Sequence, residues 1–156
     1  MKVIEFETSI RIERPLPDVF AFVADLENVP RWNYFVVEVS KTSEGLPGVG
    51  ATYHQRRKTD SQELRVVAFD PDRSVTIETI SPSRPEFSRT MTFSEEDGAT
   101  LLVDRWKLDT GHPGFLQKLA RGRIRSAVRE NLRKLKELLE TGRTTLQDGR
   151  QIRIEE

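Results

Sequence analysis

The chain has 156 residues, of which 36% are hydrophobic and 32% are charged, so its length fits one domain with a single core. Its 25 basic and 25 acidic residues cancel, which leaves no overall charge to attract nucleic acid or an anionic membrane. The sequence has no cysteine, no apolar run long enough to span a membrane and no signal-peptide core, so we expect a cytoplasmic protein without disulfides, thiolate chemistry or integral membrane association.

The start of the chain predicts a strand followed by two short helices. Residues 3–12 alternate between apolar and polar side chains, which is typical of a strand with one buried face. A proline-rich stretch then favours the first turn of a helix, which is expected over residues 16–25. Pro30 opens a second short helix or turn that carries Trp32.

Between residues 33 and 109 the pattern predicts strands joined by hairpins. The expected strands are 34–41, 51–59, 62–69, 75–81, 87–94 and 100–109. The clearest turn signal is Asp97-Gly98, because a type I′ turn needs positive φ at both central residues. Parallel strands would need long crossover connections, for which this stretch has no room, so we expect an antiparallel meander.

Residues 113–140 return to a helical period, with apolar side chains at steps of three and four residues. Gly142 is the expected stop. A helix of this length is about 40 Å long and is the only element large enough to cover the apolar face of the sheet. Gly122 inside it costs about 1 kcal/mol relative to alanine, which suggests a kink or a close approach.

The sequence predicts a single domain over residues 1–140 and a tail over residues 141–156. Asp148-Gly149 lies between two short polar stretches of that tail. The tail therefore forms either a small hairpin or a frayed, disordered end.

Together the elements predict an α+β fold in which a curved antiparallel sheet of about seven strands is closed by two short helices and one long C-terminal helix. A strongly curved sheet around a single helix often leaves a hollow between the two. A ligand would be sought in that hollow.

The sequence resembles the START-like, pollen-allergen-like helix-grip superfamily (SRPBCC), and within it the bacterial polyketide cyclase/dehydrase and lipid-transport branch. The likeness is carried, in this order, by Phe6 and Ile10 and by segments 15–25 (PLPDVFAFVAD), 28–32 (NVPRW), 49–53 (VGATY), 69–71 (FDP), 97–100 (DGAT) and 131–136 (NLRKLK). It covers about residues 3–140 and implies the helix-grip fold. The superfamily includes cyclases, hydrolases, carriers and receptors without a shared catalytic residue, so the fold does not fix the function.

The candidate ligand-binding residues are aromatic or polar side chains, together with a methionine, on the expected inner faces: Trp32, Tyr53, Gln55, Arg57, Arg89, Met91, Phe93, Asp104, Trp106 and Asn131. In similar proteins the second short helix, which here carries Trp32, lies near the cavity mouth. Trp32 either forms that rim, where its single N–H is useful, or packs between helix and sheet.

Tyr53, Gln55 and Arg57 share one face of their strand. The resemblance turns Tyr53 inward, which carries Gln55 and Arg57 inward as well. Buried glutamine and arginine need a partner or a polar ligand. The alternative is that the strand end is solvated on both sides.

Asp104 and Trp106 share a face of the last predicted strand. If that face is inward, desolvation raises the pKa of Asp104, as in many general acids and bases; if it is outward, Asp104 is solvated and inert. The same alternative holds for Glu78. Arg89 shares a face with Met91 and Phe93, which predicts core or cavity lining with Arg89 as an anchor for a ligand carboxylate.

Asn131 lies near the apolar stripe of the long helix and either reaches a ligand or is solvated. The helix carries eight basic residues against three acidic ones, which we interpret as a solvated outer face; RNA, an acidic partner and lipid headgroups are the alternatives. The two histidines, His54 and His112, have no partner at ligand spacing, so we expect no metal and no cofactor.

These patterns predict a protein that binds a hydrophobic or aromatic small molecule, lipid- or polyketide-like, between sheet and long helix, and no nucleic acid. Two alternatives stay open. One is a cyclase or dehydratase that uses a buried carboxylate and a tyrosine hydroxyl. The other is a protein-interaction module with a filled core. The identity of the ligand and the formation of a homodimer also stay open.

Overall fold

The computed structural model describes residues 3–83 and 85–154. In chain order the elements are β1 (Ile4–Ile12), α1 (Leu16–Ala24), the short 3-10 helix η1 (Leu26–Arg31), β2 (Val36–Lys41), β3 (Thr52–Arg57), β4 (Ser61–Asp70), β5 (Ser74–Thr79), β6 (Glu86–Glu96), β7 (Ala99–Asp109), α2 (Gly114–Thr141), β8 (Arg143–Thr145) and β9 (Gln151–Arg153). The predicted order of one strand, two short helices, six strands and one long helix is confirmed.

Strands β1 to β7 form one sheet in the order β1-β7-β6-β5-β4-β3-β2, with every neighbouring pair antiparallel. Consecutive strands from β2 to β7 are neighbours, as a meander requires, and β1 completes the sheet by pairing with β7. At the β6–β7 turn Asp97 and Gly98 have φ values of 49° and 82°, the positive angles that the Asp-Gly signal predicts. The antiparallel helix-grip α+β fold predicted from the sequence is thereby confirmed.

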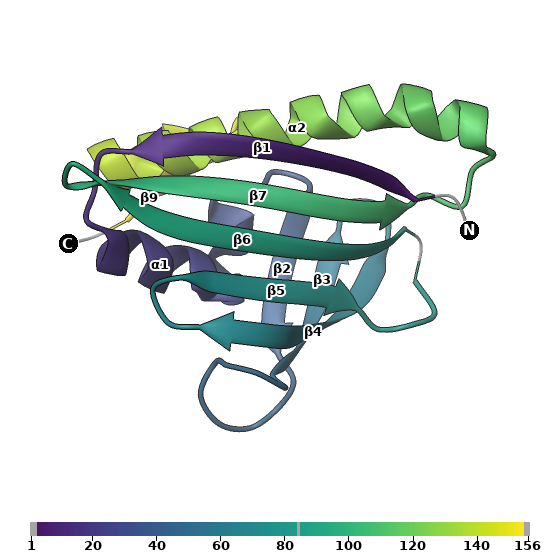
Figure 1. Ribbon diagram of the computed structural model, residues 1–156, viewed down its shortest axis with the longest axis horizontal. Helices are drawn as coiled ribbons and strands as arrows, with labels where there is room; N and C mark the ends of the chain where they lie inside the picture. The colour runs from purple at the N-terminus through teal and green to yellow at the C-terminus, as the bar shows by residue number, and fades with distance from the viewer. Residues whose placement is uncertain (1–2, 84, 155–156) are drawn as a thin grey trace.

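The sheet is strongly curved. Register shifts interrupt the pairing between Val36 and Glu38 in β2 and between Val66 and Ala68 in β4, and such bulges bend a strand and increase its twist. In Figure 1, β2 and β3 consequently run steeply across the direction of β5, β6 and β7. The curvature gives the sheet a concave face that α2 spans beside β1.

Helix α2 has 28 residues, which corresponds to about 42 Å. Its C-terminal half buries an apolar side that includes Leu132, Leu135 and Leu138. The helix ends at Gly142, whose φ of 84° and N–H bond to the carbonyl of Leu138 form a left-handed cap. The predicted stop is therefore found at the expected residue.

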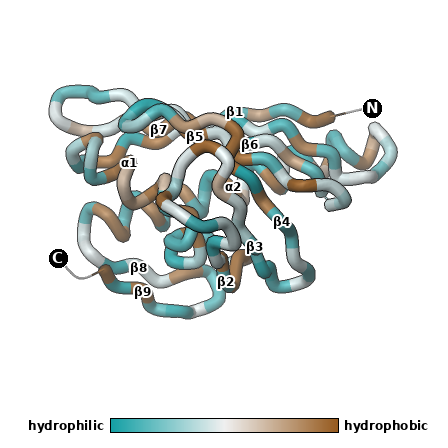
Figure 2. The backbone as a smooth tube through the Cα atoms, turned by 90° about the horizontal axis from the view of Figure 1, so that it is seen from below, coloured by the Kyte–Doolittle hydropathy of each residue, from teal (hydrophilic) through white to brown (hydrophobic). Residues whose placement is uncertain are grey.

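The core lies between the concave face and the helices. The tube in Figure 2 shows hydrophobic and hydrophilic residues alternating along the strands, so that one side of each strand is available for packing. Helix α1 covers one part of this face: the ring of Phe20 lies 5.5 Å from that of Phe69 and 5.0 Å from that of Phe93, both edge-on. This end of the sheet is filled by its own side chains.

Gly122 does not interrupt α2 and does not permit a close approach, contrary to the second sequence-based interpretation. The helix is continuous through it. A β-carbon added at Gly122 would meet no heavy atom within 4 Å, so the position faces open space.

The described part of the tail, to residue 154, forms a two-stranded hairpin of β8 and β9. It is attached to the domain by polar contacts: the Gln147 side chain donates to the Asn131 side chain (3.3 Å), and Arg150 donates to the carbonyl of Tyr34 (3.2 Å). Asp148 in its turn forms an ion pair with Lys58 (3.0 Å). Among the residues described, none of the helices is both long and apolar enough to cross a bilayer.

Candidate functional site

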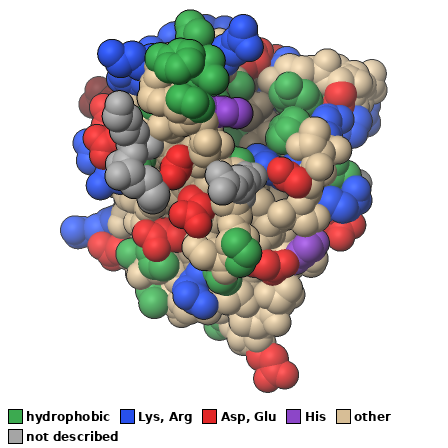
Figure 3. All heavy atoms as spheres, turned by 90° about the vertical axis from the view of Figure 1, so that its right-hand side faces the viewer, with side chains coloured by type: hydrophobic (Ala, Val, Ile, Leu, Met, Phe, Trp, Pro, Cys, Tyr) green, Lys and Arg blue, Asp and Glu red, His purple; other side chains and the backbone are tan. Residues whose placement is uncertain are grey.

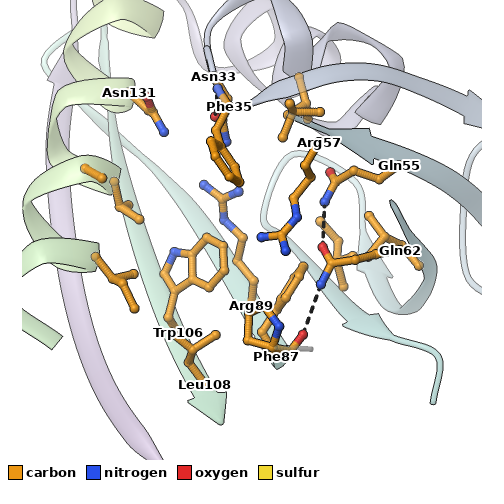
Figure 4. Close-up of a pocket in the computed structure, with 18 of the residues that line it drawn as sticks. Asn33, Phe35, Gln55, Arg57, Gln62, Phe87, Arg89, Trp106, Leu108 and Asn131 are labelled. Atoms are coloured by element: carbon orange, nitrogen blue, oxygen red, sulfur yellow. Dashed lines mark hydrogen bonds between the residues drawn. The ribbon is translucent and has the colours of Figure 1, made fainter. Parts of the chain in front are cut away.

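A cavity of about 290 Å³ lies between the concave face of the sheet and α2. Figure 4 shows side chains from strands on one side and from α2 on the other pointing toward a common space. The described residues that line it are Leu26, Val29, Asn33, Tyr34, Phe35, Val36, Gln55, Arg57, Gln62, Leu64, Ile77, Pro85, Phe87, Arg89, Met91, Trp106, Leu108, Ile124, Ala127, Val128 and Asn131. Apolar and aromatic side chains make up most of this wall.

Strand alternation places most of these side chains. In β6 the residues Phe87, Arg89 and Met91 follow one another at steps of two, and in β7 Trp106 and Leu108 do the same. The Trp106 ring packs against that of Phe87 at a centroid distance of 5.0 Å. The two strands thus contribute one continuous aromatic wall.

The central charged group of this wall is neutralised inside the protein. Arg89 donates from Nε and Nη2 to the two carboxylate oxygens of Asp104, at 2.9 and 2.6 Å. The exposed fractions of the side chains are 8% and 0%, so the pair is almost fully desolvated and depends on this two-point geometry. Arg89 also lies against Trp106 and Trp32, with its guanidinium carbon 4.5 and 5.4 Å from the ring centroids.

A second polar group follows the wall formed by β3 and β4. The side-chain amide of Gln55 donates to Gln62 (3.1 Å), and Gln62 donates in turn to the hydroxyl of Ser83 and the carbonyl of Pro85, both at 3.0 Å. Figure 4 shows this chain of bonds crossing from Gln55 toward the strand that carries Phe87. These buried amides are satisfied within the protein and hold the wall in shape.

Arg57 lies beside them and is half-buried. It donates twice to Asp60, at 2.6 Å in each case, and its guanidinium carbon is 5.3 Å from the ring centroid of Phe35. The charge of Arg57 is thus balanced by a neighbouring carboxylate, as that of Arg89 is.

The opposite wall is the middle of α2. Asn131, on this wall, is 7% exposed rather than solvated. Its side-chain oxygen accepts a hydrogen bond from Gln147 of the terminal hairpin, which leaves its amide nitrogen as the group on this wall that a ligand would meet.

The structure brings six of the predicted residues to the cavity: Gln55, Arg57, Arg89, Met91, Trp106 and Asn131. It does not place Trp32, Tyr53, Phe93 or Asp104 there. Each of these four is buried in the packed part of the core instead.

The reasons why these four residues lie outside the cavity wall differ. Trp32 is 1% exposed and packs beneath Arg89 between η1 and the sheet, so it does not form a rim. Phe93 lies under Phe20 of α1. Asp104 is turned inward, the first of the two alternatives considered, but both of its oxygens are bound by Arg89, which also removes Arg89 as a free anchor for a ligand carboxylate.

Tyr53 points inward from β3, as the resemblance implied, but into the core. It is 1% exposed, and its hydroxyl has no hydrogen-bond partner among the residues that the structure describes. Burial raises the pKa of the Tyr53 phenol, and the nearby carboxylates of Asp25 and Glu27 raise it further. Glu78, the other carboxylate considered, is exposed and accepts a hydrogen bond from Ser88.

Sequence reasoning missed several lining residues. Phe87 and Leu108 lie on the same strand faces as Arg89 and Trp106, so strand alternation was a sufficient signal for them. Tyr34 and Phe35 precede β2 in irregular backbone, where no periodicity indicates a direction. The part of α2 that lines the cavity was likewise not singled out: Ile124, Ala127 and Val128.

No metal-binding group was found: the described residues contain no cluster of three or more His, Asp or Glu side chains able to hold an ion. His54 lies on the outer face of β3 beside Glu63, and His112 is exposed in the loop before α2. Neither contributes to the cavity wall.

Comparisons with known proteins agree with this architecture. A family model described as "Polyketide cyclase / dehydrase and lipid transport" matches residues 3–140. Among solved structures, the chain is similar to the crystal structure of a protein from Deinococcus radiodurans, with a TM-score of 0.66 and 16% sequence identity over 89% of this chain and 99% of that one. At that identity the likeness supports the fold alone. The search of curated proteins returned no match.

Proposed function

Because this chain belongs to the polyketide cyclase / dehydrase and lipid transport family, we propose that it binds a hydrophobic or aromatic small molecule in the cavity between the sheet and α2. The observation that carries the proposal is the cavity itself, about 290 Å³ in volume and walled mainly by apolar and aromatic side chains. Small-molecule sites usually combine such walls with a few fixed polar groups.

The polar groups of the wall favour a ligand without a strong negative charge. Arg89 and Arg57 are each balanced by an aspartate at hydrogen-bond distance, so neither offers an uncompensated positive charge. Their guanidinium groups, together with the amide nitrogen of Asn131, are hydrogen-bond donors. A carbonyl or hydroxyl oxygen on an otherwise apolar molecule suits this set.

Acid-base catalysis receives less support. Within the described part of the chain, no Asp, Glu or His lines the cavity. The tyrosine and the carboxylate that an enzyme mechanism would use, Tyr53 and Asp104, are both buried outside it. An interaction module with a filled core is also less well supported, because the core contains the cavity.

The proposal is tested with the neutral fluorophore N-phenyl-1-naphthylamine. We expect its emission to rise on binding and to be excited by energy transfer from Trp106, which lines the cavity. The blocking variant is Val128→Phe, which adds a ring to the α2 wall, and we expect it to weaken binding at least about tenfold, or about 1.4 kcal/mol. Ile124→Phe is a second blocking variant on the same wall.

The matched control is Val67→Phe, the same substitution at a residue that is 38% exposed on β4. It should bind the fluorophore as the wild type does. Native mass spectrometry of the purified protein provides an independent measurement through any small molecule that co-purifies. Absence of both an adduct and a fluorescence response, or equal binding by folded Val128→Phe and Val67→Phe, would contradict the proposal.

A further inference from the structure

The start of α2 exposes large apolar side chains to solvent. Phe115 is 71% exposed and Leu119 is 70% exposed, while the neighbouring Leu116 is 39% exposed. Isolated exposed apolar residues are ordinary, but a group of them on one element indicates an interaction surface.

These residues lie on the side of the helix that faces away from the core. Phe115, Leu119, Gly122 and Ser126 follow at steps of four, three and four residues, which places them along one line on the helix surface. The buried side of the same helix begins with Gln117 and continues with Val128 and Asn131. The exposed apolar side chains on this outer line are Phe115 and Leu119, and with the neighbouring Leu116 they form an exposed apolar patch at the start of the helix.

Positive charge surrounds this face. Residues 113–129 contain five basic side chains and no acidic one, although the whole chain is neutral. The basic residues are Lys118, Arg121, Arg123, Arg125 and Arg129. Figure 3, which views the right-hand side of Figure 1, shows hydrophobic side chains gathered at the start of α2 with Lys and Arg side chains on both sides.

Most of this positive charge is left unpaired within the described part of the chain; of the five basic residues, Arg125 donates to the carbonyl of Glu7. Lys118, Arg121, Arg123 and Arg129 form no ion pair with any residue from 3–83 or 85–154. The first turn of α2 also has no acidic residue, unlike that of α1, which has Asp18. The positive end of the helix dipole thus adds to the same field.

We propose that the first three turns of α2 are a peripheral docking surface for an anionic lipid bilayer. A bilayer with anionic headgroups supplies negative charge at its surface and an apolar phase a few ångströms below, and an exposed apolar line flanked by Lys and Arg matches both. RNA fits less well, because Phe115 is the only aromatic side chain on the helix and stacking needs several.

The position of the surface allows such docking. In Figure 1 the start of α2 lies at one end of the molecule, next to the beginning of β1. The same helix forms a wall of the cavity further along, at Ile124 and Val128. Docking goes beyond the proposed ligand binding and does not depend on it.

The test is flotation of the full chain with vesicles made of equal parts of phosphatidylcholine and phosphatidylglycerol, against vesicles of phosphatidylcholine alone. We expect binding to the mixed vesicles only. Raising the salt from about 0.1 M to about 1 M shortens the Debye length from about 10 Å to about 3 Å and should release the protein.

The variant Phe115→Ala/Leu119→Ala should lower partitioning into mixed vesicles at least about tenfold, because both side chains lose buried apolar area. Its matched control is Leu46→Ala/Val49→Ala, two residues that are 90% and 67% exposed in the β2–β3 loop. The control should bind as the wild type does. Both pairs are exposed, so folding is unaffected.

A second comparison addresses the charge. Lys118→Gln/Arg121→Gln should weaken vesicle binding roughly fivefold for each charge removed. The control, Arg65→Gln/Arg153→Gln, removes two exposed cations from other elements and should have no comparable effect.

Three results would overturn the proposal. The first is failure of the wild type to float with either vesicle, including the case in which it binds single-stranded RNA instead. The second is flotation that Phe115→Ala/Leu119→Ala does not reduce. The third is a dimer, detected by light scattering, that this variant dissociates without any vesicle binding, since the face would then belong to a second copy. N-phenyl-1-naphthylamine binding is measured in parallel, so that loss of docking and loss of ligand binding are distinguished.

Discussion

Arg89 on β6 and Asp104 on β7 form a two-point ion pair in which the carboxylate has no exposed surface. The pair lies at the boundary between the cavity and the filled core: Arg89 lines the cavity, and Asp104 lies behind it. Trp106 and Trp32 flank the guanidinium. The shape of the cavity wall therefore depends on a desolvated charge pair.

Removing one partner should be costly. Asp104→Asn leaves the Arg89 charge buried without compensation, and we expect the free energy of unfolding to fall by about 3–5 kcal/mol. The double variant Arg89→Met/Asp104→Leu removes both charges and should cost less than Asp104→Asn alone. Urea unfolding followed by circular dichroism measures both.

The matched control is the ion pair of Arg105 with Glu7, which also joins adjacent strands but is more than half exposed at both side chains. Glu7→Gln should change the free energy of unfolding by at most about 1 kcal/mol. A cost below about 1 kcal/mol for Asp104→Asn as well would mean that solvent reaches Asp104, against the burial found here.

The Tyr53 hydroxyl is buried and has no partner among the described residues. Tyr53→Phe removes it, so we expect thermal stability at neutral pH to stay the same or to rise by up to about 1 kcal/mol. Because the pKa of Tyr53 is raised from 10.0 in the folded state, its contribution to stability is fully present below pH 10 and is lost as the pH rises above that value. Tyr53→Phe should therefore lose less stability than the wild type in alkaline solution.

Tyr34→Phe is the control for the loss of one phenol, since these are the two tyrosines of the chain. Thermal melts of the three proteins from neutral to alkaline pH provide the comparison. A clear destabilisation by Tyr53→Phe at neutral pH would show that a buried water or a ligand binds the hydroxyl.

Gly122 is an interior helix residue facing open space. Gly122→Ala removes backbone freedom from the unfolded chain without a clash, so we expect the free energy of unfolding to rise by up to about 1 kcal/mol. Chemical denaturation tests this, with Gly142→Ala as the contrasting variant. That substitution should destabilise, because Gly142 has a φ of 84°. If Gly122→Ala destabilises instead, α2 bends at this residue in solution.

Most of the fold was predictable because its strands alternate strongly and its turns carry clear signals. Phe6 to Ile12 and the Asp97-Gly98 turn are examples in which local chemistry alone determines the conformation. The curvature was predictable in outline, from one long helix that has to cover a seven-stranded sheet, but the positions of the bulges were not, because the bulges in β2 and β4 leave no distinctive residue type. The tail was ambiguous because each of its two strands has only three residues, which is too short for a clear alternation.

The candidate site was predictable only in part, because alternation distinguishes the two faces of a strand but not the two ends of one face. Met91 and Phe93 share a face, yet one lines the cavity and the other packs under α1. The Arg89–Asp104 pair did have a signal. A two-residue turn at Asp97-Gly98 places Met91 directly opposite Asp104. Arg89, two residues before Met91 on the same face, is therefore the diagonal neighbour of Asp104.

Asp148 connects the terminal hairpin to the domain through Lys58. The stability that this connection contributes should depend on pH. The carboxylate accepts hydrogen bonds from Lys58 and from the backbone and side chain of Arg150. These donors, Lys58 first, lower the pKa of Asp148 from 3.8 to about 2 against the opposing effect of desolvation. The stabilisation is present above pH 3.8 and is lost as the pH falls toward about 2, because the unfolded chain takes up the proton first.

Asp148→Asn removes this contribution, so its melting temperature should lie below that of the wild type at neutral pH. The difference should stay constant down to about pH 4 and then narrow with acidification, since below that value the wild type loses what the variant already lacks. Asp72→Asn, in the β4–β5 turn, controls for the loss of one negative charge and should not reproduce the trend. Thermal melts from neutral pH to about pH 2 give the measurement. A difference that persists unchanged below about pH 2 would show that the side chain acts through packing or a neutral hydrogen bond, because a protonated carboxyl forms no ion pair with Lys58.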